Sequence, residues 1–240
     1  MTEHIRLKPD IFFEEFTPLL IYKQSDYKSK WIAIRDQRRD KHEQYLSKIA
    51  FTDLKAYELI FQAIPNNQMI HLSNSSTVRY AQLFKLKTGF KVYCNRGTSG
   101  IDGSTSTALG AAIVGNTPTT LITGDLSFFY DSNALWNTYI PNSFRIILIN
   151  NNGGGIFRIL PGHEETETFN TYFETTHNLT AKQLCKMYNF KYENATSTEE
   201  IQHSLETFFD EADAPKLLEI FTPRIINDKV LKGYFKHLKS

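Results

Sequence analysis

Oxygen-bearing groups follow two apolar segments of the chain, and their types suit a divalent cation. Asp125 comes after the run 120–123, and Asn151 and Gly153 come after the run 144–149. A carboxylate, an amide oxygen and a backbone carbonyl are hard ligands, and Mg²⁺ completes such a small set with water and phosphate oxygens. Glycine N–H groups can also face a phosphate. The residues therefore predict a magnesium and phosphate site. The alternative is an Asp that caps a helix beside an Asn/Gly turn.

The two apolar runs are typical of buried parallel strands, because each is too short for a helix. Between them we expect a helix over 131–139, which Asp131 or Ser132 caps and Pro141 closes. The carboxyl ends of parallel strands meet at one edge of a sheet, where open α/β sheets bind ligands. Asp125, in an acidic loop, and the Asn/Gly cluster should therefore lie close together.

Strands and helices alternate from residue 51 to the end. Further strands are expected at 69–72, 90–94, 190–192 and 215–222. Helices are expected at 52–64, from about 78, and at 104–113, 180–188, 198–209 and 228–238. This alternation predicts an α/β fold, a parallel sheet with helices on both faces.

The first 50 residues differ in character, because they lack sustained strand periodicity. Residues 12–22 fit either a strand or a short helix, and 31–49 read as a charged helix. The basic run 38–41 is best explained as the solvated face of that helix, rather than as a nucleic-acid site.

Composition limits the partners that we expect. The apolar fraction is 41% and the formal net charge is +1, which argues against bulk binding of nucleic acid. No run approaches the ~20 apolar residues of a membrane span, and no secretion signal is apparent. Cys94 and Cys185 have neither metal-binding nor CxxC spacing. We expect a cytoplasmic protein without a membrane span.

The two ligand motifs together resemble the thiamine diphosphate signature of a superfamily of decarboxylases and synthases. Its first half matches Gly-Asp at 124–125, and its second matches Asn-Asn-Gly at 151–153. Leu126 departs from the pattern, because most of the superfamily has Gly there. The resemblance implies thiamine diphosphate as cofactor, bound through Mg²⁺ or Mn²⁺. It implies as metal ligands Asp125, Asn151 and Gly153.

Three segments are similar to one family within that superfamily, the 2-succinyl-5-enolpyruvyl-6-hydroxy-3-cyclohexene-1-carboxylate (SEPHCHC) synthases of menaquinone biosynthesis. They are Ser-Asn-Ser-Ser-Thr-Val-Arg at 73–79, Asn-Arg-Gly-Thr-Ser-Gly-Ile-Asp-Gly at 95–103, and Gly-Asp-Leu-Ser at 124–127. The resemblance covers roughly residues 51–221. It implies a transferase that decarboxylates 2-oxoglutarate and adds the succinyl semialdehyde unit to isochorismate.

The resemblance also implies roles for individual residues. Those expected to bind substrate are Ser75, Arg79, Arg96, Phe157 and Leu160. Those expected to bind cofactor are Asn95, Gly97, Ile101, Gly124, Asp125, Leu126, Ser127, Asn151, Gly153 and Ile156. Ile101 matches the apolar residue that props thiamine diphosphate into a V shape. For the apolar residues Ile156, Phe157 and Leu160, core packing is the alternative.

Arg79 is also a candidate from its position alone. If a helix begins near Val78, the charge of Arg79 lies in its first turn and opposes the helix dipole. That cost favours a contact with an anion, and the alternative is an ordinary surface arginine. We expect His163 and His177 to be surface residues, and the aromatic run 169–173 to pack on a neighbouring chain.

In the family, the glutamate that activates the cofactor lies in an N-terminal domain of the partner subunit. Nothing in this chain resembles that domain, so we expect no catalytic residue here and no activity of the chain alone. Residues 1–50 resemble the tail of the middle domain with its linker, and 51–240 the pyrophosphate- and metal-binding domain. The expected partners are the N-terminal pyrimidine-binding domain and further copies, as a homodimer or homotetramer.

Three other interpretations stay open. One is half of another thiamine diphosphate enzyme, such as an acetolactate-synthase-like protein, against which the segment 95–103 argues. Another is a non-catalytic module for Mg-diphosphate binding or dimerisation. The third is a Rossmann-type dinucleotide binder, but the glycines at 97, 100, 103 and 110 do not form a G-x-G sequence.

Overall fold

A computed structural model describes residues 3–115, 117–160, 162 and 164–240. The chain divides into two compact units, Met1–Lys41 and His42–Ser240. The assignment of 1–50 to a middle domain and its linker stays a prediction. His163 lies outside the described residues, so its expected surface position also stays a prediction.

The first unit is helical. It contains α1 (Pro9–Phe16), the 3₁₀ turn η1 (Thr17–Leu19) and most of α2 (Tyr27–Leu46), which continues into the second unit. Of the two alternatives for residues 12–22, the helix is therefore correct up to residue 19. The charged helix expected at 31–49 begins four residues earlier and ends three residues earlier.

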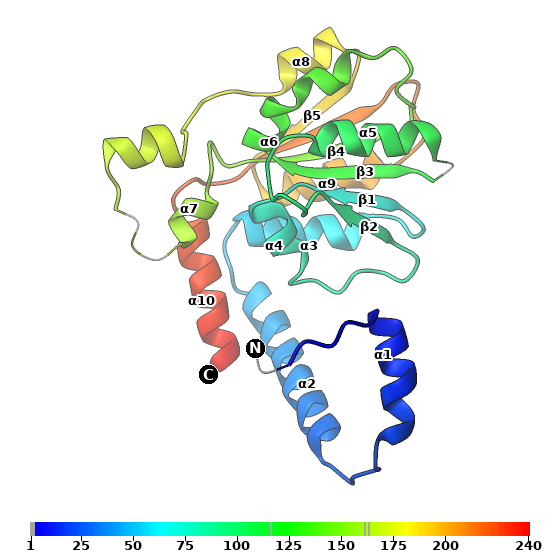
Figure 1. Cartoon of the computed structure of the whole chain (residues 1–240). Coiled ribbons are helices and arrows are strands. Elements are labelled where there is room, and N and C mark those ends of the chain that lie inside the picture. Colours follow the sequence, from blue (N-terminus) through cyan, green and yellow to red (C-terminus); the bar gives the residue numbers. More distant parts are fainter. Residues whose placement is uncertain (1–2, 116, 161, 163) are drawn as a thin grey trace. The chain divides into compact units, whose positions relative to one another are not determined.

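Six strands form one parallel sheet in the described part of the second unit (Figure 1). They are β1 (Met69–Leu72), β2 (Lys91–Cys94), β3 (Thr119–Gly124), β4 (Arg145–Asn150), β5 (Lys191–Ala195) and β6 (Lys216–Phe221). Their order is β2-β1-β3-β4-β6-β5, and every neighbouring pair is parallel. The predicted parallel sheet is confirmed, and the order reverses between β1 and β3.

Helices cover both faces of the sheet, as predicted. On β4, Ile146 and Leu148 join one core cluster, whereas Ile147 and Ile149 join the other. The first cluster includes side chains of α5 (Ser104–Val114), α6 (Asp125–Tyr130), η2 (Ser132–Trp136) and α8 (Lys182–Met187). The second includes side chains of α3 (Asp53–Ala63), α4 (Ser76–Ala81), α9 (Thr198–Phe208) and α10 (Asn227–Lys239). The alternation along each strand thus fills two separate cores.

The helix expected at 131–139 after an acidic loop is wrong. Helix α6 begins directly at Asp125, and only a 3₁₀ turn follows at Ser132–Trp136. Asp131 does not cap a helix of its own. Its carboxylate accepts hydrogen bonds from the N–H and hydroxyl of Ser106, at 2.7 and 2.5 Å, and so caps the first turn of α5.

The start of α4 also differs from the expectation. This helix begins at Ser76, so Arg79 lies in its last turn and does not oppose the helix dipole. The short helix α7 (Ile156–Ile159) and the π-helical turn η3 (Phe169–Phe173) were not predicted. Among the described residues, no helix combines the length and the apolar character that a membrane crossing needs.

Candidate functional site

A pocket of about 480 Å³ lies where β1, β2, β3 and β4 end, at the reversal of strand order. Its volume is within the range of small-molecule sites. Most residues that the sequence assigns to cofactor or substrate line it. They are Ser75, Arg79, Arg96, Ile101, Gly124, Asp125, Leu126, Ser127, Asn151, Gly153, Ile156 and Phe157. The fold therefore brings together residues from four separate segments.

Three residues assigned to the site do not line this pocket. Asn95 donates from Nδ2 to the carbonyl of Gly103 at 3.0 Å and to the hydroxyl of Thr107 at 2.9 Å, so it ties its loop to α5. Gly97 and Leu160 are exposed. The roles assigned to Asn95, Gly97 and Leu160 stay predictions.

Asp125 connects the loops that follow β3 and β4. Its side chain is buried, Oδ1 accepts from the N–H of Leu126 at 2.7 Å, and Oδ2 accepts from the N–H of Gly153 at 2.9 Å. Gly153 has φ of +144°, and a Cβ there would lie 2.6 Å from the carbonyl oxygen of Glu174. Position 153 therefore requires glycine both for its backbone conformation and for this close approach.

Asn151 is also buried, and its orientation is determined by a residue that the sequence analysis missed. Its Nδ2 donates to Oδ2 of Asp53 at 3.0 Å, so its amide oxygen is the atom left for a ligand. Asp53 precedes Asn151 by 98 positions, and no local motif links the two. Burial raises the pKa of Asp53 to about 6.

The carboxylate of Asp125, the amide oxygen of Asn151 and the carbonyl of Gly153 fit a small, hard cation. Such a site uses few protein oxygens and leaves positions for water and phosphate. In the described part of the chain, no group of three or more His, Cys, Asp or Glu side chains is placed to hold a metal. The mixed oxygen set is accordingly the candidate metal centre.

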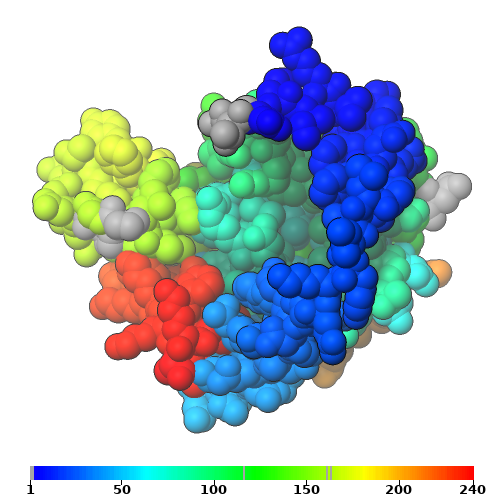
Figure 2. Space-filling view, turned by 60° about the horizontal axis from the view of Figure 1, so that its bottom comes forward, coloured from blue at the N-terminus to red at the C-terminus, as the bar shows by residue number. Residues whose placement is uncertain are grey.

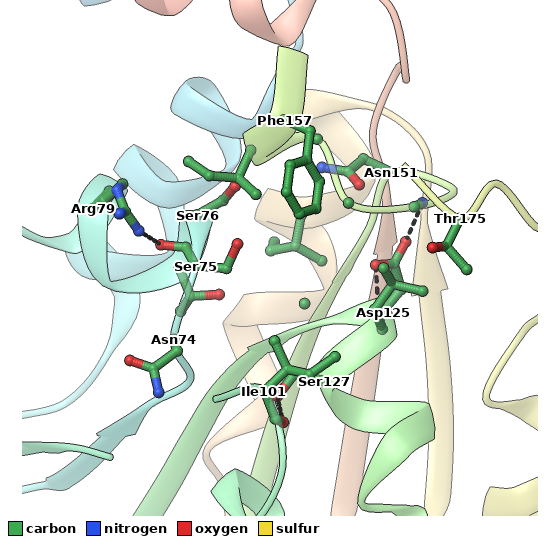
Figure 3. A pocket seen from close by; sticks show the side chains of 18 of the residues that line it. Asn74, Ser75, Ser76, Arg79, Ile101, Asp125, Ser127, Asn151, Phe157 and Thr175 are labelled. Carbon is green, nitrogen blue, oxygen red and sulfur yellow. Dashed lines mark hydrogen bonds between the residues drawn. The ribbon is translucent and has the colours of Figure 1, made fainter. Parts of the chain in front are cut away.

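Positive charge lines a different part of the pocket. Figure 3 shows Arg79 and Ser75 on one side, Asp125 and Asn151 on the other, and Phe157 and Ile101 between them. Arg79 donates to the carbonyl of Ser75 at 2.9 Å. Among the described residues, no carboxylate pairs with Arg79 or with Arg96, the other arginine of the pocket. These guanidinium groups remain available to an anion.

The loop that carries Ile101 is held at several points. Ser127 donates its hydroxyl to the carbonyl of Ile101 at 2.7 Å. Asn74 donates to the carbonyl of Gly100 at 2.6 Å and to that of Asn95, and its own amide oxygen accepts from Arg96 at 3.4 Å. A single amide thus fixes the position of both the arginine and the apolar side of the pocket.

A buried carboxylate anchors the segment that follows α7. Glu174 is completely buried and accepts two hydrogen bonds from Arg158, at 2.5 and 2.7 Å, and one from Arg224 at 2.8 Å. Its neighbours Phe173 and Thr175 line the pocket. Figure 2 shows this yellow-green segment beside the red C-terminal helix, and α7 contacts α10. Sequence reasoning missed this ion cluster.

His177 is not the surface residue that was expected. Its side chain is about 10% exposed, and Nε2 lies 3.3 Å from Oδ2 of Asp125. Its backbone carbonyl accepts from the amide of Asn152 at 3.1 Å. The segment after η3 therefore returns to the candidate metal centre.

Residues 74–220 match the model of one family, described as the thiamine pyrophosphate enzyme, C-terminal TPP binding domain. Thiamine pyrophosphate is another name for thiamine diphosphate. The match covers more than half of the chain, which therefore belongs to this family. Membership agrees with the parallel α/β fold and with the pocket at the strand ends.

Comparison with individual proteins gives relatives that share one name. The chain is 61% identical over 207 residues to a 2-succinyl-5-enolpyruvyl-6-hydroxy-3-cyclohexene-1-carboxylate synthase of Christiangramia forsetii, covering 86% of this chain and 36% of that protein. The synthase of Flavobacterium johnsoniae is 52% identical over 238 residues, covering 99% of this chain and 43% of that protein. The synthase of Porphyromonas gingivalis is 39% identical over 249 residues, covering 100% of this chain and 43% of that protein. The resemblance seen in the sequence is confirmed. The chain spans about two fifths of the length of these relatives.

Proposed function

We propose that this chain forms the part of a SEPHCHC synthase that binds diphosphate and metal. The observation that carries the proposal is the convergence of Asp125, Asn151 and Gly153 on a pocket whose other side carries Arg79 and Arg96. The proposed reaction is the decarboxylation of 2-oxoglutarate, followed by addition of the succinyl semialdehyde unit to isochorismate.

In this proposal Asp125, Asn151 and Gly153 supply oxygen ligands to Mg²⁺, and Mn²⁺ also suits them. The cation joins the protein to the diphosphate of thiamine diphosphate. When it is bound, this cofactor supplies the electron sink that decarboxylation of a 2-oxo acid requires. Ile101, held through Ser127, supports the apolar part of the cofactor.

The arginines account for the class of substrate. Both proposed substrates carry carboxylates, and guanidinium groups bind carboxylates through charge-assisted, often bidentate hydrogen bonds. Arg79 and Arg96 line the pocket without a carboxylate partner among the described residues. Ser75, whose φ is +69°, lies next to Arg79 and offers a hydroxyl to the same anion.

The proposal assigns the remaining parts of the synthase to other polypeptide segments. The activating glutamate is expected in an N-terminal pyrimidine-binding domain of a partner subunit, within a cytoplasmic homodimer or homotetramer. On this view the chain alone has no synthase activity. Product that scales with the concentration of this chain, and that disappears in Asp125→Ala, would contradict this.

Two alternatives differ in measurable ways. An acetolactate-synthase-like half would favour a 2-oxo acid other than 2-oxoglutarate once its partner domain is supplied, so substrate profiling of the reconstituted enzyme decides. A non-catalytic module would bind Mg-diphosphate but yield no product with any partner domain.

The direct test is calorimetric titration of thiamine diphosphate into this chain, with and without Mg²⁺. We expect binding that depends on Mg²⁺ and is lost in Asp125→Ala. The matched control is Asp213→Ala, because the side chain of Asp213 is 85% exposed and pairs with Lys191 on the edge strand β5. Equal binding by all three proteins, or binding indifferent to Mg²⁺, would contradict the proposed site.

A further inference from the structure

A buried carboxylate lies beside the candidate metal centre and lines the same pocket. Asp53 is the first residue of α3, and its exposed fraction is 2%. Oδ2 accepts from Nδ2 of Asn151 at 3.0 Å, and Oδ1 accepts from the hydroxyl of Thr222 at 2.5 Å. The backbone N–H of Asp53 donates to Oδ1 of Asn227 at 2.9 Å. Residues that follow β4 and β6 thus hold this carboxylate in one orientation, and α10 holds its backbone.

The chemistry of an amide explains what this orientation does. The side chain of Asn151 presents an oxygen at one position and an NH₂ group at the other, and only the oxygen can bind a cation. An ionised carboxylate accepts hydrogen bonds and donates none. The NH₂ group must therefore face Asp53, which directs the oxygen away from it. Without Asp53, either orientation of the amide is available.

We propose that Asp53 is a positioning residue, which orients Asn151 so that its amide oxygen is presented to the divalent cation. The inference rests on the proposed function, because it takes Asn151 as a metal ligand. Thr222 supports this orientation indirectly, because its hydroxyl holds the Asp53 carboxylate. Partners of this kind, which contact a ligand but not the metal, commonly change metal affinity by about 10–100-fold when they are removed.

A buried carboxylate with a purely structural role would behave differently. Its removal would lower the stability of the chain without a specific loss of metal affinity, and the polarity of its hydrogen bond to Asn151 would not matter. The two roles are therefore separated by exchanging the two side chains, which keeps the carboxylate, the amide and the total charge.

The experiment uses the complete chain, with Mn²⁺ as the probe and thiamine diphosphate present. Free and bound Mn²⁺ are counted by electron paramagnetic resonance. We expect Asp53→Ala to weaken Mn²⁺ binding by about 10–100-fold. Asn151→Asp alone places two carboxylates against each other and should also bind weakly. The exchange Asp53→Asn/Asn151→Asp should recover most of the loss, because the new amide donates to the new carboxylate and one carboxylate oxygen still faces the metal.

A second pair of variants, with smaller changes, tests the proposal even if Asp53→Ala does not fold. Thr222→Val removes the hydroxyl that holds Asp53 but keeps the charge, and we expect a several-fold loss of Mn²⁺ affinity. Thr180→Val is the matched control, because the hydroxyl of Thr180 donates to the buried carboxylate of Glu219 at 2.6 Å. That carboxylate accepts from Asn150, which is not a proposed ligand. The control should keep its affinity at a similar cost in melting temperature.

A second measurement needs no bound metal. In ¹⁵N-labelled chain, the side-chain amide of Asn151, assigned by its absence in Asn151→Asp, should exchange slowly with solvent. It should exchange faster in Thr222→Val and Asp53→Ala but not in Thr180→Val. Normal Mn²⁺ affinity in folded Asp53→Ala, or failure of the exchange variant to recover affinity, would overturn the positioning role and leave the proposed function standing. Absence of Mn²⁺-dependent cofactor binding by the unchanged chain would overturn both.

Discussion

The carbonyl oxygen of Glu174 accepts a hydrogen bond of 2.6 Å from the N–H of Gly154, while its carboxylate is enclosed by Arg158 and Arg224. One residue therefore joins the glycine-rich loop after β4 to a buried ion cluster. Gly153 lies close to the same carbonyl oxygen, because a Cβ on Gly153 would be 2.6 Å from it.

Gly153→Ala should damage the site and the fold together. Position 153 has a φ that a residue with a Cβ rarely adopts, and the added atom would lie 2.6 Å from the Glu174 oxygen. We expect a loss of about 1–3 kcal/mol in unfolding free energy and loss of Mg²⁺-dependent binding of thiamine diphosphate. The control is Gly110→Ala in helix α5, where a Cβ meets nothing within 4 Å. The Gly110→Ala variant should gain about 0.5–1 kcal/mol in unfolding free energy. Denaturant unfolding and calorimetry measure both effects.

Glu174→Gln should be far more costly than Glu165→Gln, although both residues pair with Arg158. The side chain of Glu174 is 0% exposed, whereas that of Glu165 is 53% exposed. Breaking the buried pair costs about 3–5 kcal/mol, because Arg158 then keeps only the exposed Glu165 as an acidic partner. The exposed pair contributes up to about 1 kcal/mol. Chemical denaturation gives the two values, and limited proteolysis of the segment after α7 should accelerate only in Glu174→Gln. Equal effects of the two changes would contradict the role of the buried cluster.

Ser127→Ala should weaken cofactor binding as well as stability. The change removes the hydroxyl that donates to the carbonyl of Ile101 at 2.7 Å, at a cost of about 1–3 kcal/mol for the unpaired carbonyl. Ser132→Ala removes a similar bond, of 3.0 Å to the carbonyl of Phe129, away from the pocket lining. We expect weaker thiamine diphosphate binding only in Ser127→Ala. If calorimetry gives both variants the affinity of the unchanged chain, Ile101 does not depend on this bond for its function.

His71 should lower the stability of the chain in mild acid. Burial lowers the pKa of His71, and its Nε2 has no hydrogen-bond partner among the described residues. Because the folded-state pKa is below the unfolded value of about 6.5, the unfolded chain binds the proton more readily. The contribution of His71 to stability is therefore full above that value and is lost as the pH decreases further.

His71→Phe tests this relation and keeps an aromatic ring against Tyr93, whose ring centroid lies 5.4 Å away. The melting temperature of the variant should decrease less between pH 7 and pH 5 than that of the unchanged chain. The pH profile that remains combines a decrease from His42, whose pKa burial also lowers, with an increase from Asp53, whose pKa burial raises to about 6. Parallel pH profiles of the two proteins would refute the contribution of His71.

The strands and most helices could be predicted because their signals are local. Short apolar runs mark the strands, and amphipathic segments mark α3, α9 and α10. The segment after Asp125 was mispredicted because the partner of Asp131 is Ser106, 25 positions earlier, and no local pattern reveals it. The start of α4 was placed two residues late, which put Arg79 in the wrong turn.

The candidate site likewise contains residues that the sequence could reveal and residues that it could not. Its loop-tip residues belong to contiguous motifs, so their types and spacing are visible in the sequence. The residues that hold them are scattered: Asp53 acts on Asn151 from 98 positions away, and Glu174 joins Arg224 from 50 positions away. A buried acid and a surface acid have the same letter in a sequence. Only the fold shows which of them faces a ligand loop.

The connection between Asp53 and Thr222 has a consequence for how the protein is made. The two residues are 169 positions apart, and Asn227 is 174 positions from Asp53. Synthesis proceeds from the N-terminus, so a growing chain exposes Asp125 and Asn151 before the groups that hold Asp53 leave the ribosome. Under the proposed function, the metal ligand Asn151 acquires its final orientation only when β6 and the start of α10 have been added. Our proposal therefore couples loading of the cation to completion of the sheet, and predicts that a nascent chain ending before Thr222 retains the cation poorly.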